Sequence, residues 1–336
     1  MSRLRIGTRG SALALAQAEQ VRALLAERRP GLDIEIAVVR VSGDSPTPPQ
    51  DPATRDARGS ATTATAAAED KRRWVDMIED ALLAGEIDLA VHSAKDVPGE
   101  LADGLELLGS PARAAVEDVL CVAARSPAEG ERGPTGLDGL TEGARIGTSS
   151  IRRAAQLRAA REDLDVVAMG GNVDTRLRTL ADGAFDAIVL ARAGLQRLGR
   201  EDAIGAVLDP ARFVPAPGQG ALALEARAGD ARVTEAVAAI LDDDASACLL
   251  AERALAGALD ASCHTPLGAH ARPAGCGCLE LRAWVGLPDG SAWVSDELLG
   301  GFYDPASLGR RVAERLGAAG AAELLARGRE MIVSQI

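Results

Sequence analysis

Short apolar runs of strand length alternate with longer segments of helical periodicity along the first two thirds of the chain. The first series has strands at 4–8, 34–41 and 87–91 and a helix at 12–27. The second series has a helix at 151–161 and strands at 119–123, 144–147, 166–169 and 185–190. Such alternation is typical of α/β domains with a mainly parallel sheet. We therefore predict two successive α/β domains.

The tetrapeptide Arg-Ile-Gly-Thr occurs once in each series, at 5–8 and at 145–148. A serine and a predicted helix follow each copy, and arginines lie close by: Ser11 with Arg9, and Ser149 and Ser150 with Arg152 and Arg153. A strand that turns through glycine into a helix presents free backbone N–H groups, which bind anions. Both strand ends are therefore predicted anion sites.

The pattern changes after Ala245. A helix at 247–258 precedes two strand-like segments at 279–285 and 292–298, and further helices follow Asp304. This order predicts a smaller α+β domain. The segment 45–69 is rich in Pro, Thr, Ala and Asp without periodicity, so we expect it to be mobile, either as an inert insertion or as a lid.

Charge and composition exclude several classes of function. The formal charge of -12 opposes binding to nucleic acid or anionic membranes, and three Trp, three Phe and one Tyr provide few platforms for base stacking. With neither a secretion signal nor a long apolar span, we expect a cytoplasmic protein. Lys71 and Lys95 are the only lysines, so nearly every cation is arginine. Arginine suits carboxylate binding, although codon bias is an alternative explanation.

Polar segments follow several of the predicted strands. The segment 92–98, His-Ser-Ala-Lys-Asp-Val-Pro, comes directly after a strand, where open α/β sheets place their ligands. Alone, it is better explained by a helix cap and an ion pair. Four further segments share its character: 147–153, 171–177, 217–221 and the loop 261–268 that contains Cys263. The ordered set is much more specific than any one of its members.

This ordered set resembles the hydroxymethylbilane synthase (porphobilinogen deaminase) family, from Arg5 almost to the C-terminus. The resemblance implies an α/β fold with two domains of the periplasmic-binding-protein type around a cleft, and a small α+β C-terminal domain. It implies a discontinuous first domain at 1–112 and 218–240, a second at 113–217, and a third at 241–336 that carries Cys263.

The resemblance also implies an activity, that of a transferase in porphyrin and heme biosynthesis. Four porphobilinogen molecules are joined head to tail on a covalent dipyrromethane cofactor, four ammonia molecules leave, and the linear tetrapyrrole hydroxymethylbilane is released. The cofactor is expected to be held by a thioether to Cys263. We expect a monomer whose partner is the small-molecule substrate, without nucleic acid or membrane.

Site residues follow from the matched motifs. Asp96 is the expected catalytic residue, because its carboxylate would hydrogen-bond pyrrole N–H groups, stabilise the developing cation and assist proton transfer. The pyrroles carry acetate and propionate groups, which arginines, hydroxyl groups and helix N-termini bind. The expected cofactor ligands are Lys95, Asp96, Thr148, Ser149, Ser150, Arg152, Arg153 and Arg176. The expected substrate ligands are Arg9, Ser11, Arg153, Arg176, Arg197 and Gln219.

The remaining cysteines have simpler interpretations. Cys121 and Cys248 are expected to be buried as small apolar residues, and the pair Cys276 and Cys278 lacks the spacing of a zinc site, so no metal is expected. His264 adjoins Cys263 but adjacent side chains usually point apart, so we favour a surface or packing role for it.

The chain departs from the family pattern at three places. Gly170 occupies the position of a family arginine, the segment 70–74 replaces a glycine-rich stretch before an aromatic residue, and Ala261 and Ser262 replace two glycines before the cysteine. Two alternatives therefore stay open: a degenerate member that loads the cofactor but elongates poorly, and a dicarboxylate-binding protein without a covalent ligand.

Overall fold

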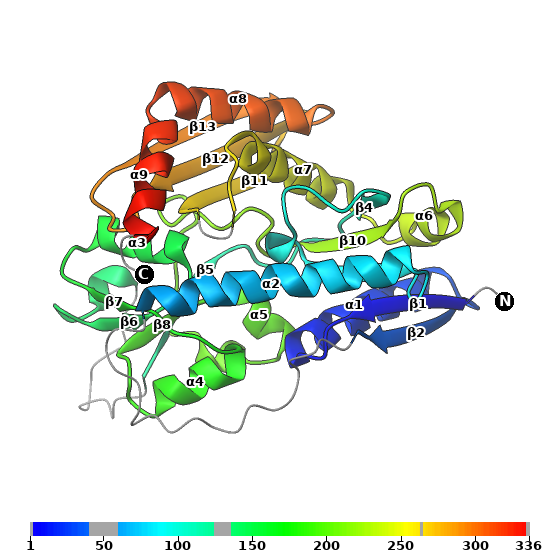
Figure 1. Cartoon of the computed structure of the whole chain (residues 1–336), viewed down its shortest axis with the longest axis horizontal. Helices are drawn as coiled ribbons and strands as arrows, with labels where there is room; N and C mark the ends of the chain where they lie inside the picture. The colour runs from blue at the N-terminus through cyan, green and yellow to red at the C-terminus, as the bar shows by residue number, and fades with distance from the viewer. Residues whose placement is uncertain (1–2, 40–59, 124–135, 263–264, 334–336) are drawn as a thin grey trace.

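The computed structural model describes residues 3–39, 60–123, 136–262 and 265–333. Its first sheet has the strand order β2-β1-β3-β10-β4 (Figure 1). The strands are β1 (Arg3–Thr8), β2 (Asp33–Val38), β3 (Leu89–Ser93), β4 (Leu105–Gly109) and β10 (Leu222–Arg227). Only β10 runs antiparallel to its neighbours in this sheet. The accompanying helices are α1 (Ala12–Arg28), α2 (Ser60–Leu83) and α6 (Ala231–Ala238).

The second sheet repeats this design with the order β7-β6-β8-β5-β9. Its strands are β5 (Asp118–Val122), β6 (Arg145–Gly147), β7 (Asp165–Val167), β8 (Ala187–Ala191) and β9 (Ala206–Val207). The antiparallel strand β5 occupies the place of β10. The helices of this second sheet are α3 (Ile151–Ala160), α4 (Val173–Ala181) and α5 (Arg192–Arg197). Two 3-10 turns, η3 (Leu137–Gly139) and η4 (Glu201–Ala203), belong to the same unit. The predicted pair of mainly parallel α/β units is thus confirmed.

The repeated tetrapeptide lies at equivalent places in the two sheets. In each copy an aspartate just before the neighbouring strand accepts a hydrogen bond from the arginine N–H: Arg5 to Asp88 and Arg145 to Asp186, both at 2.8 Å. In each copy the N–H of that aspartate also donates to the arginine carbonyl at 2.9 Å. The short sequence repeat therefore marks a structural repeat, which brings both following helices to the C-terminal ends of their sheets.

The chain passes between the two sheets twice, from β4 to β5 and from β9 back to β10. The return segment is tightly enclosed: a Cβ on Gly218 would lie 2.9 Å from the carbonyl carbon of Ala94, and one on Gly220 would lie 2.5 Å from the oxygen of Ala114. Both glycines have positive φ, which other residues rarely adopt. This double crossing supports the discontinuous first domain, 1–112 with 218–240, that we propose.

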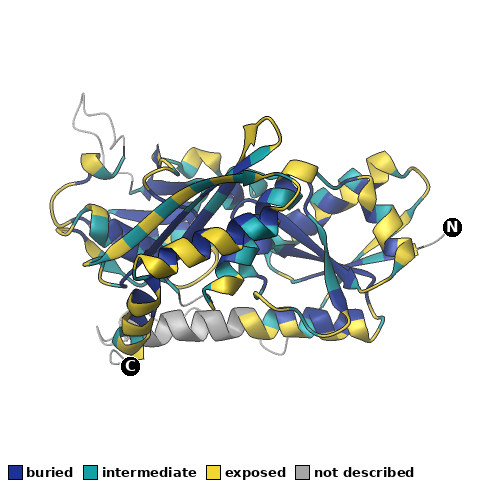
Figure 2. Ribbon diagram, turned by 90° about the horizontal axis from the view of Figure 1, so that it is seen from above, coloured by how far each residue is buried: buried dark blue, intermediate teal, exposed yellow. Residues whose placement is uncertain are grey.

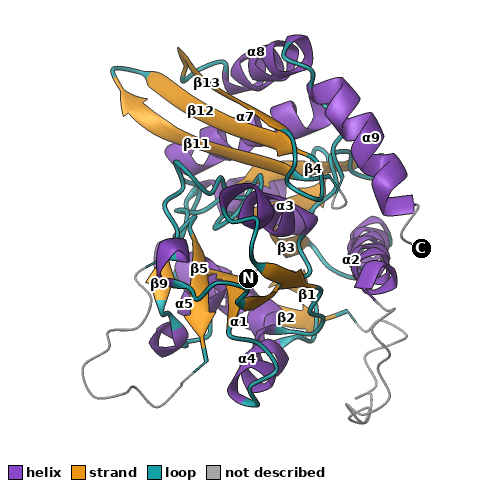
Figure 3. Cartoon of the chain, turned by 90° about the vertical axis from the view of Figure 1, so that its left-hand side faces the viewer, coloured by secondary structure: helices purple, strands orange, loops and turns teal. Residues whose placement is uncertain are grey.

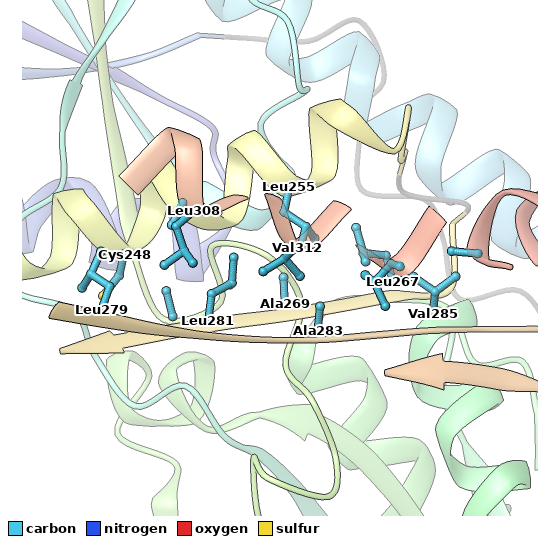
Figure 4. Close-up of a cluster of buried hydrophobic side chains, with 14 of the residues drawn as sticks. Cys248, Leu255, Leu267, Ala269, Leu279, Leu281, Ala283, Val285, Leu308 and Val312 are labelled. Atoms are coloured by element: carbon cyan, nitrogen blue, oxygen red, sulfur yellow. The ribbon is translucent and has the colours of Figure 1, made fainter. Parts of the chain in front are cut away.

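The C-terminal unit packs helices on one face of the antiparallel sheet β11-β12-β13 (Figure 3). Its strands are β11 (Leu267–Gly275), β12 (Cys278–Gly286) and β13 (Trp293–Gly301), and its helices are α7 (Asp243–Ala258), α8 (Pro305–Ala318) and α9 (Ala321–Val333). Leu255, Leu281 and Val312 are fully buried between α7, α8 and the sheet (Figure 4). The predicted α+β unit is confirmed, although its first strand, β11, was not predicted.

One buried carboxylate ties this unit to both crossing segments. Glu252 Oε1 accepts hydrogen bonds from Arg113 Nη1 and the Ala271 N–H, both at 2.7 Å. Its Oε2 accepts from the Gly218 N–H at 2.6 Å and from Arg113 Nη2 at 3.0 Å. Arg113 lies in the first crossing segment, Gly218 in the return segment and Ala271 in β11. The three parts of the molecule therefore meet at a single side chain.

The prediction of a mobile segment at 45–69 is wrong for its last ten residues. Residues 60–69 form the start of α2, because their alanines favour helix and continue into the amphipathic stretch that covers the first sheet. Residues 45–59 lie outside the described part of the chain. Figure 2 shows exposed residues along α8 and along the coloured second part of α2, from residue 72 onward, with buried residues on the strands. Among the described helices, none is both long and apolar enough to cross a bilayer.

Candidate active site

Polar side chains from the first sheet line a cavity of about 90 Å³ at the C-terminal ends of β1 and β3. The lining includes Arg9 and Ser11 after β1, Trp74 on α2, and His92 and Asp96 at the end of β3. Ser11 caps α1 by accepting a hydrogen bond from the Ala14 N–H at 3.3 Å. The predicted substrate ligands Arg9 and Ser11 and the predicted catalytic residue Asp96 thus share one cavity.

Arg9 is held against an aromatic ring. Its guanidinium carbon lies 3.1 Å from the ring centroid of Trp74, a cation–π contact from β1 to α2. Trp74 belongs to the segment 70–74 that departs from the family pattern. The tryptophan retains an aromatic wall in this cavity and limits the orientations that Arg9 can adopt.

Three contacts hold the segment that carries Lys95 and Asp96, whose 3-10 turn η2 (Ala94–Asp96) follows β3 directly. Gln17 on α1 donates to Ser93 Oγ at 2.7 Å. Arg253 on α7 donates to the carbonyls of Pro98 at 2.6 Å and Gly99 at 3.0 Å. The Ala94 N–H donates to the Ala221 carbonyl at 3.1 Å. The proposed catalytic carboxylate is therefore carried by a turn fixed from α1, α7 and the return segment.

In the second unit, Arg152 and Arg153 point inward onto a fully buried aspartate. Arg152 Nη2 donates to Asp118 Oδ2 at 2.8 Å, and Arg153 Nη2 donates to Oδ1 at 2.6 Å. Gln219 Nε2 donates to the same carboxylate at 3.0 Å. Burial raises the pKa of Asp118, but the two arginine charges outweigh it and lower the pKa to about 2.

These contacts change how the three predicted ligands are understood. Both arginines are less than one tenth exposed, and Gln219 is fully buried. Their hydrogen bonds join β5, α3 and the return segment. They therefore form a buried layer behind the predicted anion site at the N-terminus of α3. Sequence reasoning missed Asp118; its only signal is one acidic residue at the start of an apolar strand.

Arg176 and Ser149 form the part of the second unit that faces the first. Arg176 Nη2 donates to Ser149 Oγ at 2.8 Å, and its Nε donates to the Gly171 carbonyl at 2.8 Å. Burial, together with the charge of Arg153, lowers the pKa of Arg176 to about 10, whereas Asp96 acts in the opposite direction. Asp96 therefore lies near enough to influence Arg176, which links the two predicted sites electrostatically.

Arg197, Ser150 and Thr148 are the other predicted ligands of the second unit, and each is engaged within the protein. Arg197 Nη2 donates to the Gly220 carbonyl at 2.8 Å, whereas its buried Nε has no partner among the described residues. Burial lowers the pKa of Arg197 to about 10. Ser150 caps α3 by accepting a hydrogen bond from the Arg153 N–H at 3.4 Å, and Thr148 Oγ1 accepts from the Ser150 N–H at 3.2 Å.

Cys263 and His264 lie outside the described residues, so their predicted roles stay predictions. Cys121 and Cys248 are buried, and burial raises the pKa of each thiol to about 12, as expected for packing residues. Cys276 is exposed at the turn between β11 and β12. Among the described residues, no three His, Cys, Asp or Glu side chains gather as metal ligands would.

Two family models match this chain. "Porphobilinogen deaminase, dipyromethane cofactor binding domain" matches residues 4–235, and "Porphobilinogen deaminase, C-terminal domain" matches residues 246–318. The chain belongs to the porphobilinogen deaminase family. The family that we expected from the ordered motifs is therefore confirmed. The expected transferase class of its members is confirmed as well.

Curated relatives cover nearly the whole chain. Proteins named porphobilinogen deaminase are 44% identical in Rubrobacter xylanophilus, 42% in Xanthomonas oryzae and 40% in Syntrophobacter fumaroxidans. These alignments cover 96%, 97% and 96% of this chain and 96%, 99% and 96% of the relatives. The porphobilinogen deaminase similarity therefore includes all three structural units.

Solved structures give a much weaker likeness. The periplasmic aliphatic sulphonate binding protein SsuA from Escherichia coli matches at a TM-score of 0.40 and 15% identity, covering 77% of this chain and 71% of SsuA. Substrate binding domain 2 of Lactococcus lactis GlnP matches at 0.40 and 11%, covering 70% and 86%. These scores are too low to support an inference.

Proposed function

We propose that this chain is an active hydroxymethylbilane synthase, which condenses four porphobilinogen molecules head to tail with loss of ammonia. The observation that carries the proposal is the pairing of two walls: Asp96 with Arg9 and Ser11 on the first unit, and Arg176 with Ser149 on the second. We further propose that the enzyme acts as a cytoplasmic monomer, without nucleic acid or membrane partners.

The residues at the second wall fit a dipyrromethane. When bound, this cofactor supplies the permanent primer to which pyrroles are added. Its acetate and propionate groups need cationic and N–H donors, and the wall offers Arg176, Ser149, Ser150 and the N-terminus of α3. Arg197, whose buried Nε has no partner among the described residues, would add positive charge. We propose Lys95 and Thr148 as additional ligands and Cys263 as the thioether anchor.

Because Arg152 and Arg153 are paired with Asp118, we propose that they act on the cofactor mainly through position and charge. Two guanidinium groups share one carboxylate, so the cluster keeps a net positive charge directly behind α3. That charge favours anions at the N-terminus of α3 without requiring either arginine to leave Asp118. Gln219 would act in the same indirect way.

Asp96 is proposed to carry the chemistry at the first wall. A carboxylate there accepts hydrogen bonds from pyrrole N–H groups and stabilises the positive charge that develops as ammonia leaves. Arg9, restrained by Trp74, and Ser11 would orient the acid side chains of the incoming porphobilinogen.

The intact mass of the purified protein tests the cofactor assignment. We expect a dipyrromethane adduct on the wild type and an unmodified chain for Cys263→Ala, with Cys248→Ala as the matched control that keeps the adduct. An unmodified wild type would overturn the assignment and favour a dicarboxylate-binding protein.

Turnover is measured separately with porphobilinogen as the substrate. Asp96→Asn should keep the adduct and lose product formation, and unchanged turnover would refute the role proposed for Asp96.

A further inference from the structure

Three buried ionisable side chains lie behind the wall that carries Asp96, and none has a role in the mechanism above. His92 on β3 lines the same cavity as Asp96. Its Nε2 lies 2.9 Å from Glu225 Oε2 on β10, and the two side chains are 6% and 0% exposed. Glu79 on α2 completes the group and is also buried.

The ring of His92 is oriented by its partner. A carboxylate at Nε2 favours the neutral tautomer with its proton on Nε2, which leaves Nδ1 as the basic nitrogen. A carboxylate behind an imidazole is also the arrangement that stabilises the imidazolium once a proton arrives. Since His92 lines the cavity and Glu225 is not among its lining residues, a proton that moves between the cavity and this pair would pass through the His92 ring.

Two buried carboxylates, Glu225 and Glu79, lie close to His92. Glu225 is fully buried, and its Oε1 has no partner among the described residues. Burial, followed by the nearby carboxylates of Glu225 and Asp76, raises the pKa of Glu79, whereas a backbone hydrogen bond from Ala102 and the proximity of His92 act in the opposite direction. Arg253 on α7 is the nearby cation, and it is engaged with backbone carbonyls. Of the three side chains, His92 is the one that both lines the cavity and contacts Glu225.

We propose that His92, oriented by Glu225, is the proton carrier of the condensation. The proposal rests on the function proposed above. Each condensation forms one carbon–carbon bond, and it breaks a ring carbon–hydrogen bond and the carbon–nitrogen bond of the aminomethyl group. The electron pair of the carbon–hydrogen bond returns to the ring. His92 accepts the proton at Nδ1 and passes it to the released ammonia, which leaves as ammonium, so the imidazole is regenerated in every cycle.

The first test is the kinetics of His92→Gln. General acid–base catalysis typically contributes at least about 10²-fold, so kcat should fall by about that factor while KM stays within about twofold. His270→Gln, a histidine on β11 in the third unit, is the matched control and should keep full activity. Glu225→Gln removes the charge behind the ring and should lower kcat less, with an altered pH dependence.

A structural role for His92 would give a different pattern. For His92→Ala we expect added imidazole to restore part of kcat in proportion to its neutral form, which a packing defect would not allow. Intact mass must show the cofactor adduct in every variant, so that a failed cofactor assignment is distinguished from a failed proton carrier. Unchanged kcat in His92→Gln, or a loss that imidazole does not rescue, overturns the proposal.

A measurement without turnover completes the test. The chain has three histidines, so substitution can assign their ring signals in NMR spectra. In loaded Asp96→Asn protein, porphobilinogen should shift the His92 ring signal and leave that of His270 unchanged. An unshifted His92 signal with bound substrate would place the ring too far from the reacting atoms.

Discussion

At the scale of single residues, the fully buried carboxylate of Asp118 organises the second unit. It holds Arg152, Arg153 and Gln219 together. A buried ion pair contributes modestly as a pair, but removing one partner leaves the other charge buried and uncompensated. Asp118 therefore keeps Arg152, Arg153 and Gln219 in place, although it does not line the cavity itself.

Asp118→Asn should lower the free energy of unfolding by about 3–5 kcal/mol, measured by urea denaturation near neutral pH. Because the pKa of Asp118 falls from an ordinary 3.8 to about 2 on folding, its contribution is present above 3.8 and is lost as the pH falls toward 2. The difference between wild type and variant should therefore shrink across this interval. Asp163→Asn, which removes an exposed partner of Arg161, is the control and should change stability little.

Gly170→Arg tests whether the departure from the family pattern limits turnover. A Cβ on Gly170 meets no atom within 4 Å, so the larger side chain fits. If one carboxylate contact is missing, its recovery is worth about 1.5–3 kcal/mol, or about tenfold or more in kcat/KM. Gly317→Arg, equally unobstructed but on α8, should leave kcat/KM unchanged. Equal values for the wild type and Gly170→Arg would show that the wild-type site lacks no contact there.

At the scale of elements, the N-termini of α1 and α3 repeat one design, in which a serine cap follows the Arg-Ile-Gly-Thr strand. Sequence could predict this because the tetrapeptide, the serine and the helical period are all local. It could not predict β10 as the antiparallel strand inside the first sheet, since that depends on pairing with β3 and β4, far away in the chain. The two-residue strand β9 is too short to leave a pattern.

Ser150→Ala and Asp304→Ala should each lower the free energy of unfolding by about 1 kcal/mol, because each removes a side-chain acceptor from a helix N-terminus. Only Ser150→Ala should also slow cofactor loading, followed by intact mass after adding porphobilinogen to the apoprotein. Asp304 caps α8 in the third unit and serves as the matched control. Equal loading rates in both variants would remove the α3 N-terminus from the proposed cofactor site.

At the scale of the whole molecule, Glu252 connects the two crossing segments with the third unit. Glu252→Gln removes the charge opposite Arg113, which is nine-tenths buried. It should lower the free energy of unfolding, measured by calorimetry, by about 3–5 kcal/mol. Glu280→Gln, which breaks a pair with the exposed Arg272, should cost less than about 1 kcal/mol. A similar small loss in both would mean that the three units are not coupled through Glu252.

Because the chain passes between the sheets twice, the second unit is an insertion within the sequence of the first. Both of its ends leave the first sheet close together, since the Ala114 N–H donates to the Gly220 carbonyl at 3.2 Å. A short linker replacing 114–217, which keeps Arg113 opposite Glu252, should therefore close the first unit without strain on β4 or β10. Such a minimal protein would retain the Arg9 and Asp96 cavity but lack Arg176, and porphobilinogen affinity would then measure what one wall contributes alone.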